Sequence, residues 1–428
     1  MAEKLYSKAE SNFSLDSMCK TQLDIYRSIV QRGIAAKDSK RHYDAIISGY
    51  YGFKNIGDDA MLMKILDDLR KYKKDPRFVV LSNDPVEIRK TYGINSINRI
   101  NIPKIIRTMK NSDLFLYGGG TLIQESTSTR SLFYYLLIIW VAKKMGLNVM
   151  LYANGIEPIN KYINRKLTQK VMNGIDLITL REEESAKVLQ KLGIDKPGIV
   201  VTVDPAFNIE PAPPARVSEI FSDEGMGEEG PFIGFSARKW DGFRHNEEAS
   251  AVIALAEAAD HMAIRYNAKP VFIPMQPKDI AILDNIVSKM KKNAFVLRKK
   301  YSVREVLGIT SRMEIMVGMR LHSLVFAASL GIPVVGLVYE PKVDSFLKYI
   351  GQSDASAGSV KHLDGSKLIA LLDDTWNRRD KISAEILEVT KDLKAKALVN
   401  ASLAAGLMRE AHNKRRPSGK DGADEKNG

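Results

Sequence analysis

Short apolar runs alternate with longer amphipathic stretches along most of the chain. The first run, residues 44–48, leads through a glycine-containing loop into a helical pattern over residues 60–70. The alternation continues with predicted strands over residues 77–82, 113–117, 148–153 and 176–180, and with predicted helices over residues 86–92, 132–145 and 161–173. Apolar periodicity of this kind separates strands from helices. Repeated strand and helix units predict a doubly wound parallel sheet.

The pattern is interrupted once and then restarts. Residues 211–230 begin with several prolines and end in a segment rich in Glu and Gly, which favours a linker. Strands predicted over residues 231–236, 271–276, 313–317 and 334–338 follow, with helices over residues 247–266 and 279–291. We therefore predict an α/β fold of two Rossmann-like domains, residues 43–210 and 231–376. They would face one another across a cleft, in the arrangement called glycosyltransferase-B-like.

The two ends of the chain fall outside these domains. Residues 1–42 show only a weak amphipathic stripe, which predicts a leader helix without a chemical role. Residues 377–414 predict a long helix that packs back on the first domain, and residues 415–428 have the composition of a disordered tail.

Composition narrows the setting in which the protein acts. No apolar run reaches the length of a membrane span, and the first residues lack the apolar segment of a secretory signal. We therefore expect a cytoplasmic protein. Cys19 is the only cysteine, which excludes an intrachain disulfide and a thiolate metal cluster.

The formal net charge of +13 admits three classes of partner: nucleic acid, an anionic membrane surface, or an anionic small substrate. Zinc-finger spacing and RNA-recognition signatures are missing from the sequence, so we expect no nucleic acid. The basic stretch Lys161–Lys170 also contains Tyr162 and Ile163, and it could lie near anionic lipid at the inner face of the plasma membrane.

The segment Gly318–Ser323 carries the strongest chemical signal. It lies between the predicted strand 313–317 and a run of small and apolar residues, which predicts a strand, a tight turn and a helix. Arg320 and His322 would then lie beside a helix N-terminus, where anions are favoured. A guanidinium can bind a carboxylate or phosphate, and an imidazole can move a proton near neutral pH. On residue type alone, a structural turn histidine and a surface arginine are equally good readings.

Further candidates follow the carboxyl ends of other predicted strands. The loop 49–59 contains three glycines and Asp58, a predicted helix N-cap, and Gly118–Gly120 follows the strand 113–117. Such loops allow a ligand phosphate to approach the backbone closely, although a tight turn would also explain them. The remaining candidates at strand ends are Asn154, Arg181, Asp204, Arg238, Gln276 and Glu340. Arg181 and Arg238 could instead form structural salt bridges, and Glu340 could be an acid at a helix N-terminus.

Taken together, six motifs in one order resemble the polysaccharide pyruvyl transferase family, and in particular the bacterial pyruvyl transferases that serve cell-surface anchoring. The motifs are Gly49-Tyr50-Tyr51-Gly52-x-x-Asn55-x-Gly57-Asp58, Gly118-Gly119-Gly120-x-Leu122-x-Gln124, Tyr152-Ala153-Asn154-Gly155, Arg181, Asp204-Pro205-Ala206 and Gly318-Met319-Arg320-Leu321-His322-Ser323. The resemblance covers about residues 44–350. Glu157 departs from it, because glycine is usual at this position, and this leaves the acceptor open.

The resemblance implies transfer of the enolpyruvyl unit of phosphoenolpyruvate to a sugar, which forms a 4,6-ketal of pyruvate and releases phosphate. It implies an N-acetylmannosamine residue of a lipid-diphosphate-linked oligosaccharide as the acceptor, in the synthesis of a cell-wall polymer that anchors surface-layer proteins. Arg181, Arg238 and Arg320 would neutralise the two anionic groups of the donor, and His322 would carry the proton. We expect no cofactor and identify no cluster of metal ligands.

The same resemblance implies which other residues bind substrate. They are Gly49, Tyr50, Gly52, Asn55, Gly57, Asp58, Gly118, Gly119, Gly120, Gln124, Asn154, Asp204, Gln276, Leu321 and Glu340. By analogy, the first domain would bind the acceptor and the second the donor.

Two other functions remain open at this point. A glycosyltransferase of the same architecture would use a nucleotide sugar. A catalytically inactive relative would bind carbohydrate or act as a membrane scaffold.

Overall fold

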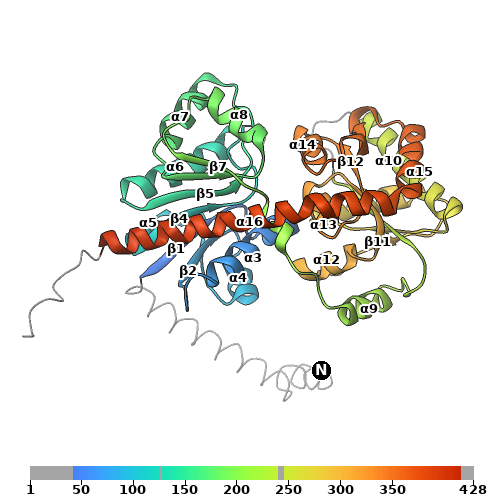
Figure 1. Cartoon of the computed structure of the whole chain (residues 1–428), viewed down its shortest axis with the longest axis horizontal. Coiled ribbons are helices and arrows are strands. Elements are labelled where there is room, and N and C mark those ends of the chain that lie inside the picture. The colour runs from blue at the N-terminus through green and yellow to red at the C-terminus, as the bar shows by residue number, and fades with distance from the viewer. Residues whose placement is uncertain (1–41, 126–127, 240–244, 416–428) are drawn as a thin grey trace, which may run out of the picture. The chain divides into compact units, whose positions relative to one another are not determined.

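The computed structural model describes residues 42–125, 128–239 and 245–415. The described residues from Asp44 onward form one compact unit. The predicted leader helix lies almost entirely outside the described residues, and so does the predicted disordered tail. Within the described part, two parallel sheets carry helices on their faces, which confirms the predicted α/β class (Figure 1).

The first sheet has seven strands in the order β3-β2-β1-β4-β5-β6-β7. Its strands are β1 (Tyr43–Ser48), β2 (Phe78–Ser82), β3 (Asn95–Asn98), β4 (Ser112–Gly118), β5 (Asn148–Asn154), β6 (Leu177–Leu180) and β7 (Gly198–Val201). Its helices are α3 (Ile56–Arg70), α4 (Pro85–Tyr92), α5 (Ile102–Lys110), α6 (Thr129–Lys144), α7 (Tyr162–Met172) and α8 (Glu183–Lys191). The order reverses direction at β1 and β4, so the loops after these strands diverge and leave room for a ligand at their carboxyl ends.

The second sheet has six strands in the order β10-β9-β8-β11-β12-β13. Its strands are β8 (Phe232–Ser236), β9 (Lys269–Phe272), β10 (Phe295–Val296), β11 (Met313–Gly318), β12 (Val334–Val338) and β13 (Ser356–Ser359). Its helices are α10 (His245–Arg265), α11 (Ile280–Val287), α12 (Val303–Thr310), α13 (Leu321–Ser329), α14 (Pro341–Tyr349) and α15 (Gly365–Asn377). Here the order reverses at β8 and β11.

Two predicted boundaries need correction. Residues 211–230 are not a bare linker, because α9 (Pro214–Asp223) forms within them and buries Val217, Ile220 and Phe221. Proline suits the first turn of a helix, where no partner for its missing N–H is needed. Helix α3 also begins earlier than predicted. Its N-cap is Asn55, whose side chain accepts from the backbone N–H of Gly57, so Asp58 lies in the first turn instead.

The long C-terminal helix α16 (Arg379–Arg415) links the two halves (Figure 1). It contacts α3, β4 and β5 on the first half, α13 and α15 on the second, and the 3-10 turn η1 (Pro205–Asn208) between them. Asn400 on this helix is fully buried and accepts from the Thr202 hydroxyl at 2.8 Å.

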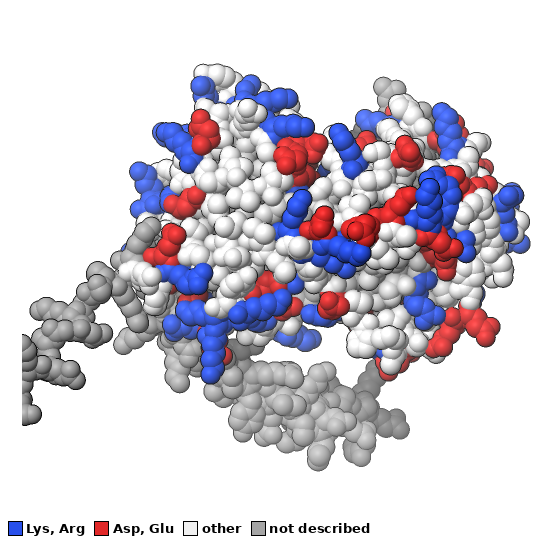
Figure 2. Space-filling model, viewed as in Figure 1, with Lys and Arg blue, Asp and Glu red and all other residues white. Residues whose placement is uncertain are grey.

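Charged side chains of both signs are interspersed over the surface, with basic ones in excess (Figure 2). Among the described residues, no helix combines the length and the apolarity that a bilayer crossing requires.

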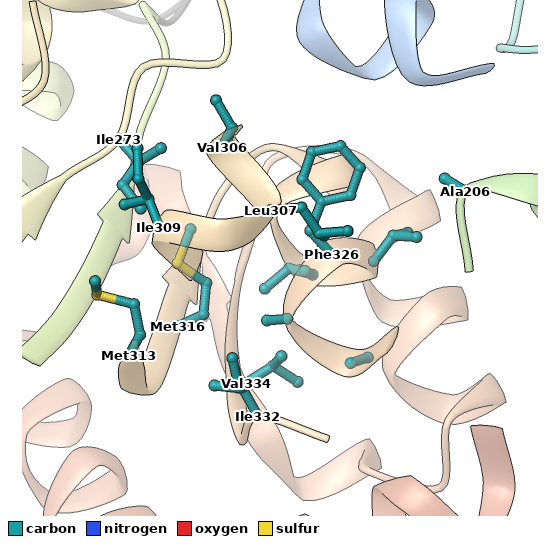
Figure 3. Close-up of a cluster of buried hydrophobic side chains, with 14 of the residues drawn as sticks. Ala206, Ile273, Val306, Leu307, Ile309, Met313, Met316, Phe326, Ile332 and Val334 are labelled. Atoms are coloured by element: carbon teal, nitrogen blue, oxygen red, sulfur yellow. The ribbon is translucent and has the colours of Figure 1, made fainter. Parts of the chain in front are cut away.

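A continuous apolar core fixes the loop that carries Arg320 and His322. Figure 3 shows Leu307 of α12, Met316 of β11 and Phe326 of α13 meeting in this cluster. The cluster extends to Phe207 of η1 and Ala60 of α3, so the two halves share buried surface. Burial of this kind holds the start of α13 against η1 and α3 with little freedom.

Candidate active site

A cavity of about 530 Å³ opens at the carboxyl ends of both sheets. The loops after β1 and β4 and the end of β6 line it from the first half, and the loops after β8, β9, β11 and β12 line it from the second. Ligand sites of open parallel sheets form at this edge, because the strand order reverses there. The position therefore marks the cavity as the candidate site.

The cavity gathers most of the polar residues that the sequence singles out. Its lining includes Tyr50, Asn55, Asp58, Gly120, Gln124, Arg181, Arg238, Gln276, Arg320, Leu321, His322 and Glu340. These residues are separated by up to some 290 positions, and only the parallel topology brings them together.

The turn between β11 and α13 presents His322 and Arg320 to the cavity. Arg320 is the N-cap residue of α13, and His322 lies in its first turn. The Arg320 guanidinium donates to Asp279 at 2.5 Å and to the Gln276 amide oxygen at 3.0 Å. These two contacts hold one edge of the buried guanidinium, while its Nε has no hydrogen-bond partner among the described residues. The two contacts orient the guanidinium, and its Nε donor is left for a ligand.

The His322 side chain contacts a carboxylate of the first half. Its Nε2 lies 3.4 Å from Oδ2 of Asp204, the residue that caps η1. The same carboxylate oxygen accepts from Nη1 of Arg181 at 3.4 Å. Burial raises the pKa of Asp204, but His322 and then Arg181 outweigh it and hold the pKa below its usual range. Asp204 is therefore ionised at neutral pH and stabilises a positive charge on the imidazole.

Arg181 is fixed more tightly than a surface arginine. It is buried, and its second guanidinium nitrogen donates to Thr121 at 3.0 Å. Its Nε lies 3.7 Å from a Glu182 carboxylate oxygen. The alternative of a strand-end salt bridge thus holds in part, because Arg181 pairs with Asp204 and still lines the cavity.

The exit of β12 contributes a second cationic cluster. Two cations lie close to the Tyr339 ring. The Arg238 guanidinium is 5.0 Å and the Lys342 ammonium 5.3 Å from the ring centre. Lys342 also pairs with Glu340. Burial lowers the pKa of Lys342, but Tyr339 and Glu340 more than offset this and leave the pKa raised. Glu340 occupies the N-cap position of α14 without a capping hydrogen bond, so its carboxylate serves Lys342 instead.

Asp58 introduces a carboxyl group with an unusual titration. Its side chain is buried at the first turn of α3, which raises its pKa to about 6, although His322, Arg181 and Arg320 partly offset the effect. Burial likewise raises the pKa of the adjacent Asp59 to about 7. A carboxyl that titrates near neutral pH can accept or donate a proton in a reaction.

Aromatic rings form the wall on the first half. Tyr50 stacks on Phe53 with ring centres 4.0 Å apart, and Tyr50 and Tyr135 both line the cavity. The Arg99 guanidinium lies 5.2 Å from the Tyr135 ring centre. Apolar ring faces beside polar groups suit a sugar, whose faces are apolar and whose edges carry hydroxyls.

Several predicted substrate-binding residues lie behind the lining. Gly49, Gly52, Gly57, Gly118, Gly119, Asn154 and Asp204 are outside it. The glycines are explained by close packing: a Cβ on Gly118 would come within 2.6 Å of the Tyr51 hydroxyl, and Gly119 has a φ of +64°. Asn154 donates to the carbonyls of Tyr117 and Tyr152 and so fixes the strand end. The geometry supports a structural role for these glycines and Asn154, whereas Asp204 contacts His322 and Gly120 lines the cavity.

The sequence interpretation missed part of the lining. The additional residues are Thr121, Leu122, Ser131, Tyr135, Lys239, Met275, Lys278, Met319, Tyr339 and Lys342. Tyr339 and Lys342 flank Glu340 at a strand end, and that position is a signal that could have identified them. Ser131 lies in the first turn of α6 and Tyr135 in its second, and nothing in the sequence marks either as a site residue.

Across the cavity, Arg181, Arg238, Lys239, Lys278, Arg320 and Lys342 face only two lining carboxyls, Asp58 and Glu340. The fold and this cationic site define a two-sheet α/β protein of the glycosyltransferase-B-like class. The model of one family, polysaccharide pyruvyl transferase, matches residues 55–341. The chain therefore belongs to the polysaccharide pyruvyl transferase family and is a transferase. None of the curated proteins matches the chain in sequence.

Solved structures resemble the chain in fold at low sequence identity. A glycosyltransferase from Rickettsia africae has a TM-score of 0.55 and 12% identity, over 89% of this chain and 100% of its own. A UDP-GlcNAc 2-epimerase from Neisseria meningitidis, bound to UDP-GlcNAc, has a TM-score of 0.55 and 13% identity, over 86% and 100%. MnaA of S. aureus in complex with UDP has a TM-score of 0.56 and 13% identity, over 87% and 96%. These similarities confirm the fold predicted from the sequence.

Proposed function

We propose that the chain transfers the enolpyruvyl group of phosphoenolpyruvate to a sugar of a polysaccharide precursor and closes it to a 4,6-ketal. The observation that supports this most directly is the presence of Arg181, Arg238, Arg320 and His322 in the lining of one cavity. A carboxylate and a phosphate on a three-carbon donor need several cations and one proton carrier, and these residues provide both.

In the first step, the protonated His322 imidazole gives its proton to the methylene carbon of the donor. Positive charge develops at the neighbouring carbon, and a sugar hydroxyl attacks that carbon and forms a C–O bond. Asp58, with a pKa near 6, can accept the hydroxyl proton. The arginines stabilise the carboxylate and phosphate charges throughout, and such donors can each contribute several kcal/mol, about 3 for one well-placed group.

In the second step, the bond between this carbon and the phosphate oxygen breaks, and phosphate leaves with the bonding electrons. A second hydroxyl of the same sugar attacks the carbon and loses its proton, which closes the ring. One proton enters at the methyl group and two leave the hydroxyls, so the released phosphate and the solvent take up the difference. The net change is donor plus diol to ketal plus phosphate, with no oxidant or reductant.

The two walls of the cavity suit donor and acceptor differently. The cations Arg238, Arg320 and Lys342 belong to the second half, and we assign the donor to them. The aromatic wall of Tyr50 and Tyr135 belongs to the first half, and we assign the acceptor sugar to it. An N-acetylmannosamine residue carried on a lipid diphosphate, for a cell-wall polymer that anchors surface-layer proteins, is the acceptor that the family likeness suggests.

Phosphate release from phosphoenolpyruvate with a lipid-linked acceptor tests the proposal. We expect the His322→Ala variant to lose at least about 10²-fold in rate, the range of a positioned acid or base. His362, an exposed histidine, supplies the matched control in His362→Ala, which should retain the full rate. Equal rates for His322→Ala and the unaltered chain would remove His322 from the mechanism.

A nucleotide-sugar glycosyltransferase is the competing function on this fold. Thermal protection distinguishes the two, because a ligand stabilises the protein that binds it. Protection by phosphoenolpyruvate supports the pyruvyl transfer, whereas protection by uridine diphosphate alone contradicts it.

A further inference from the structure

The outer face of α6 exposes a stripe of large apolar side chains. Phe133, Leu137 and Trp140 have exposed fractions of 39%, 49% and 45%. Their spacing of four and three residues places them on one side of the helix. Ser131 and Tyr135 lie on the opposite side and line the cavity. The three side chains are therefore not part of the hydrophobic core of the described residues.

The stripe continues onto the start of α7. Thr129 lies one turn before Phe133, and its hydroxyl accepts from the Lys161 ammonium at 3.1 Å. The next two residues, Tyr162 and Ile163, are exposed by 73% and 72%. We call Phe133, Leu137, Trp140, Tyr162 and Ile163 the α6–α7 patch.

Basic side chains surround this patch and acidic ones are missing from its helices. Neither α6 nor α7 contains an Asp or Glu residue. The ammonium of Lys144 lies 6.0 Å from the Trp140 ring centre, and that of Lys166 lies 5.9 Å from the Tyr162 ring centre. Exposed basic residues Arg130, Arg165 and Lys170 belong to the same two helices. Figure 2 shows basic side chains along the edge of the molecule where α7 lies.

The patch is connected to the cavity through short covalent and hydrogen-bonded paths. Tyr135 in the lining and Phe133 in the patch are two residues apart on one helix. On the second path, Gln124 lines the cavity, and its neighbour Glu125 accepts from the backbone N–H of Asn160 at 2.7 Å, just before α7. A surface that fixes the patch would therefore also fix the mouth of the cavity.

We propose that the α6–α7 patch docks on the surface of an anionic lipid bilayer. Trp140 and Tyr162 would lie at the level of the headgroups, where amphipathic rings are favoured, and Phe133, Leu137 and Ile163 would enter the acyl boundary. The surrounding Lys and Arg side chains would meet the anionic headgroups. The combination of exposed aromatic rings with basic residues, and the absence of Asp and Glu from both helices, favours a lipid surface over a protein partner.

The docking itself does not depend on the reaction. Its benefit for catalysis rests on the proposed function, since a docked cavity would lie near acceptors that are anchored in the same bilayer. The two proposals can therefore fail separately.

Vesicle co-sedimentation of the full chain tests the docking. We expect binding to phosphatidylcholine vesicles that contain phosphatidylglycerol to exceed binding to phosphatidylcholine alone at least about tenfold, and to weaken with salt. The double variant Leu137→Gln/Trp140→Gln should lose at least about tenfold in binding. Ile264→Gln is the matched control, because Ile264 is an exposed apolar residue of α10, and it should bind normally.

Three results would overturn the proposal. The unaltered chain could fail to bind anionic vesicles, or the double variant could bind them as well as the control. The double variant could also abolish a dimer seen by sedimentation velocity while vesicle binding stays normal, which would assign the patch to a second copy of the chain. Phosphate release with a soluble acceptor serves as the separate readout. It should be unchanged in the double variant, and its loss in the unaltered chain would reject only the proposed reaction.

Discussion

Asp204 and His322 come from opposite halves of the chain, and their side chains meet at 3.4 Å beside the cavity. Asp204 follows the first sheet and His322 begins a helix of the second half, so the contact exists only in the assembled fold. The proton transfer proposed for His322 would therefore depend on how the two halves pack.

Replacement of Asp204 by asparagine should lower the rate of phosphate release. The ionised carboxylate stabilises positive charge on the His322 ring at 3.4 Å, and the neutral amide removes this interaction. We expect kcat/KM to fall by about tenfold or more, the range for the loss of a charged partner. Asp195→Asn, at an exposed position, is the control, and an unchanged kcat/KM in Asp204→Asn would contradict the assigned role.

Gly57 should resist even the smallest side chain, because of its position against His322. A Cβ there would come within 2.6 Å of Cγ of the His322 ring. Alanine favours a helix, so Gly57→Ala should retain the fold. The contact with the new Cβ should displace the imidazole and lower kcat by up to about 10²-fold.

Gly406 provides the comparison for this substitution. It lies in α16, and a Cβ there would meet nothing within 4 Å. Gly406→Ala should keep full activity and gain roughly 0.5–1 kcal/mol in free energy of unfolding. Turnover is measured together with circular dichroism, which checks the fold. Normal turnover in Gly57→Ala would contradict the prediction, because it would show that the His322 ring accommodates the new Cβ.

The sequence predicted the central strands because their apolar runs are plain. It missed the edge strands β3, β7, β10 and β13, and it took the proline-rich start of α9 for a linker. Edge strands pair on one side only and need no continuous apolar pattern, so they leave a weak periodic signal.

The candidate site was predictable where it depends on strand ends. The carboxyl ends of parallel strands share one edge of a sheet. Arg181 and Arg238 could therefore each be expected at the carboxyl edge of its own sheet. The packing of Gly57 on His322 and the place of Tyr135 in the lining depend on the contact between the halves, which no local pattern encodes.

Asn400 should stabilise the attachment of α16 to the first half. It is fully buried, accepts from the Thr202 hydroxyl at 2.8 Å and donates to the Val203 carbonyl at 3.1 Å. Asn400→Ala leaves the Val203 carbonyl without this donor and should lower the free energy of unfolding by roughly 1–3 kcal/mol. Chemical denaturation measures the loss. Asn413→Ala, at an exposed position of the same helix, should leave the free energy of unfolding nearly unchanged. Equal stability of the two variants would contradict the stabilising role of Asn400.

The buried carboxyl of Asp58 should make the fold less stable as the pH rises. Its pKa is raised from 3.8 to about 6, so the folded state favours the protonated form. The corresponding stability is complete below about pH 4 and is lost as the pH rises through about 6, with a total change of about 3 kcal/mol. The asparagine in Asp58→Asn cannot ionise, so the variant should keep this contribution to the free energy of unfolding at every pH.

The comparison of Asp58→Asn with the unaltered chain should therefore depend on pH. The gain in free energy of unfolding should be about 1 kcal/mol at pH 4.5 and approach roughly 3 kcal/mol at pH 8, measured by chemical denaturation. Asp58 also raises the pKa of Asp59, so the variant should lower the pKa of that neighbour. Asp392→Asn, at an exposed position of α16, should show no such trend. A gain that is the same at both pH values would mean that Asp58 titrates normally, and it would then be too weak a base near neutral pH to take the hydroxyl proton.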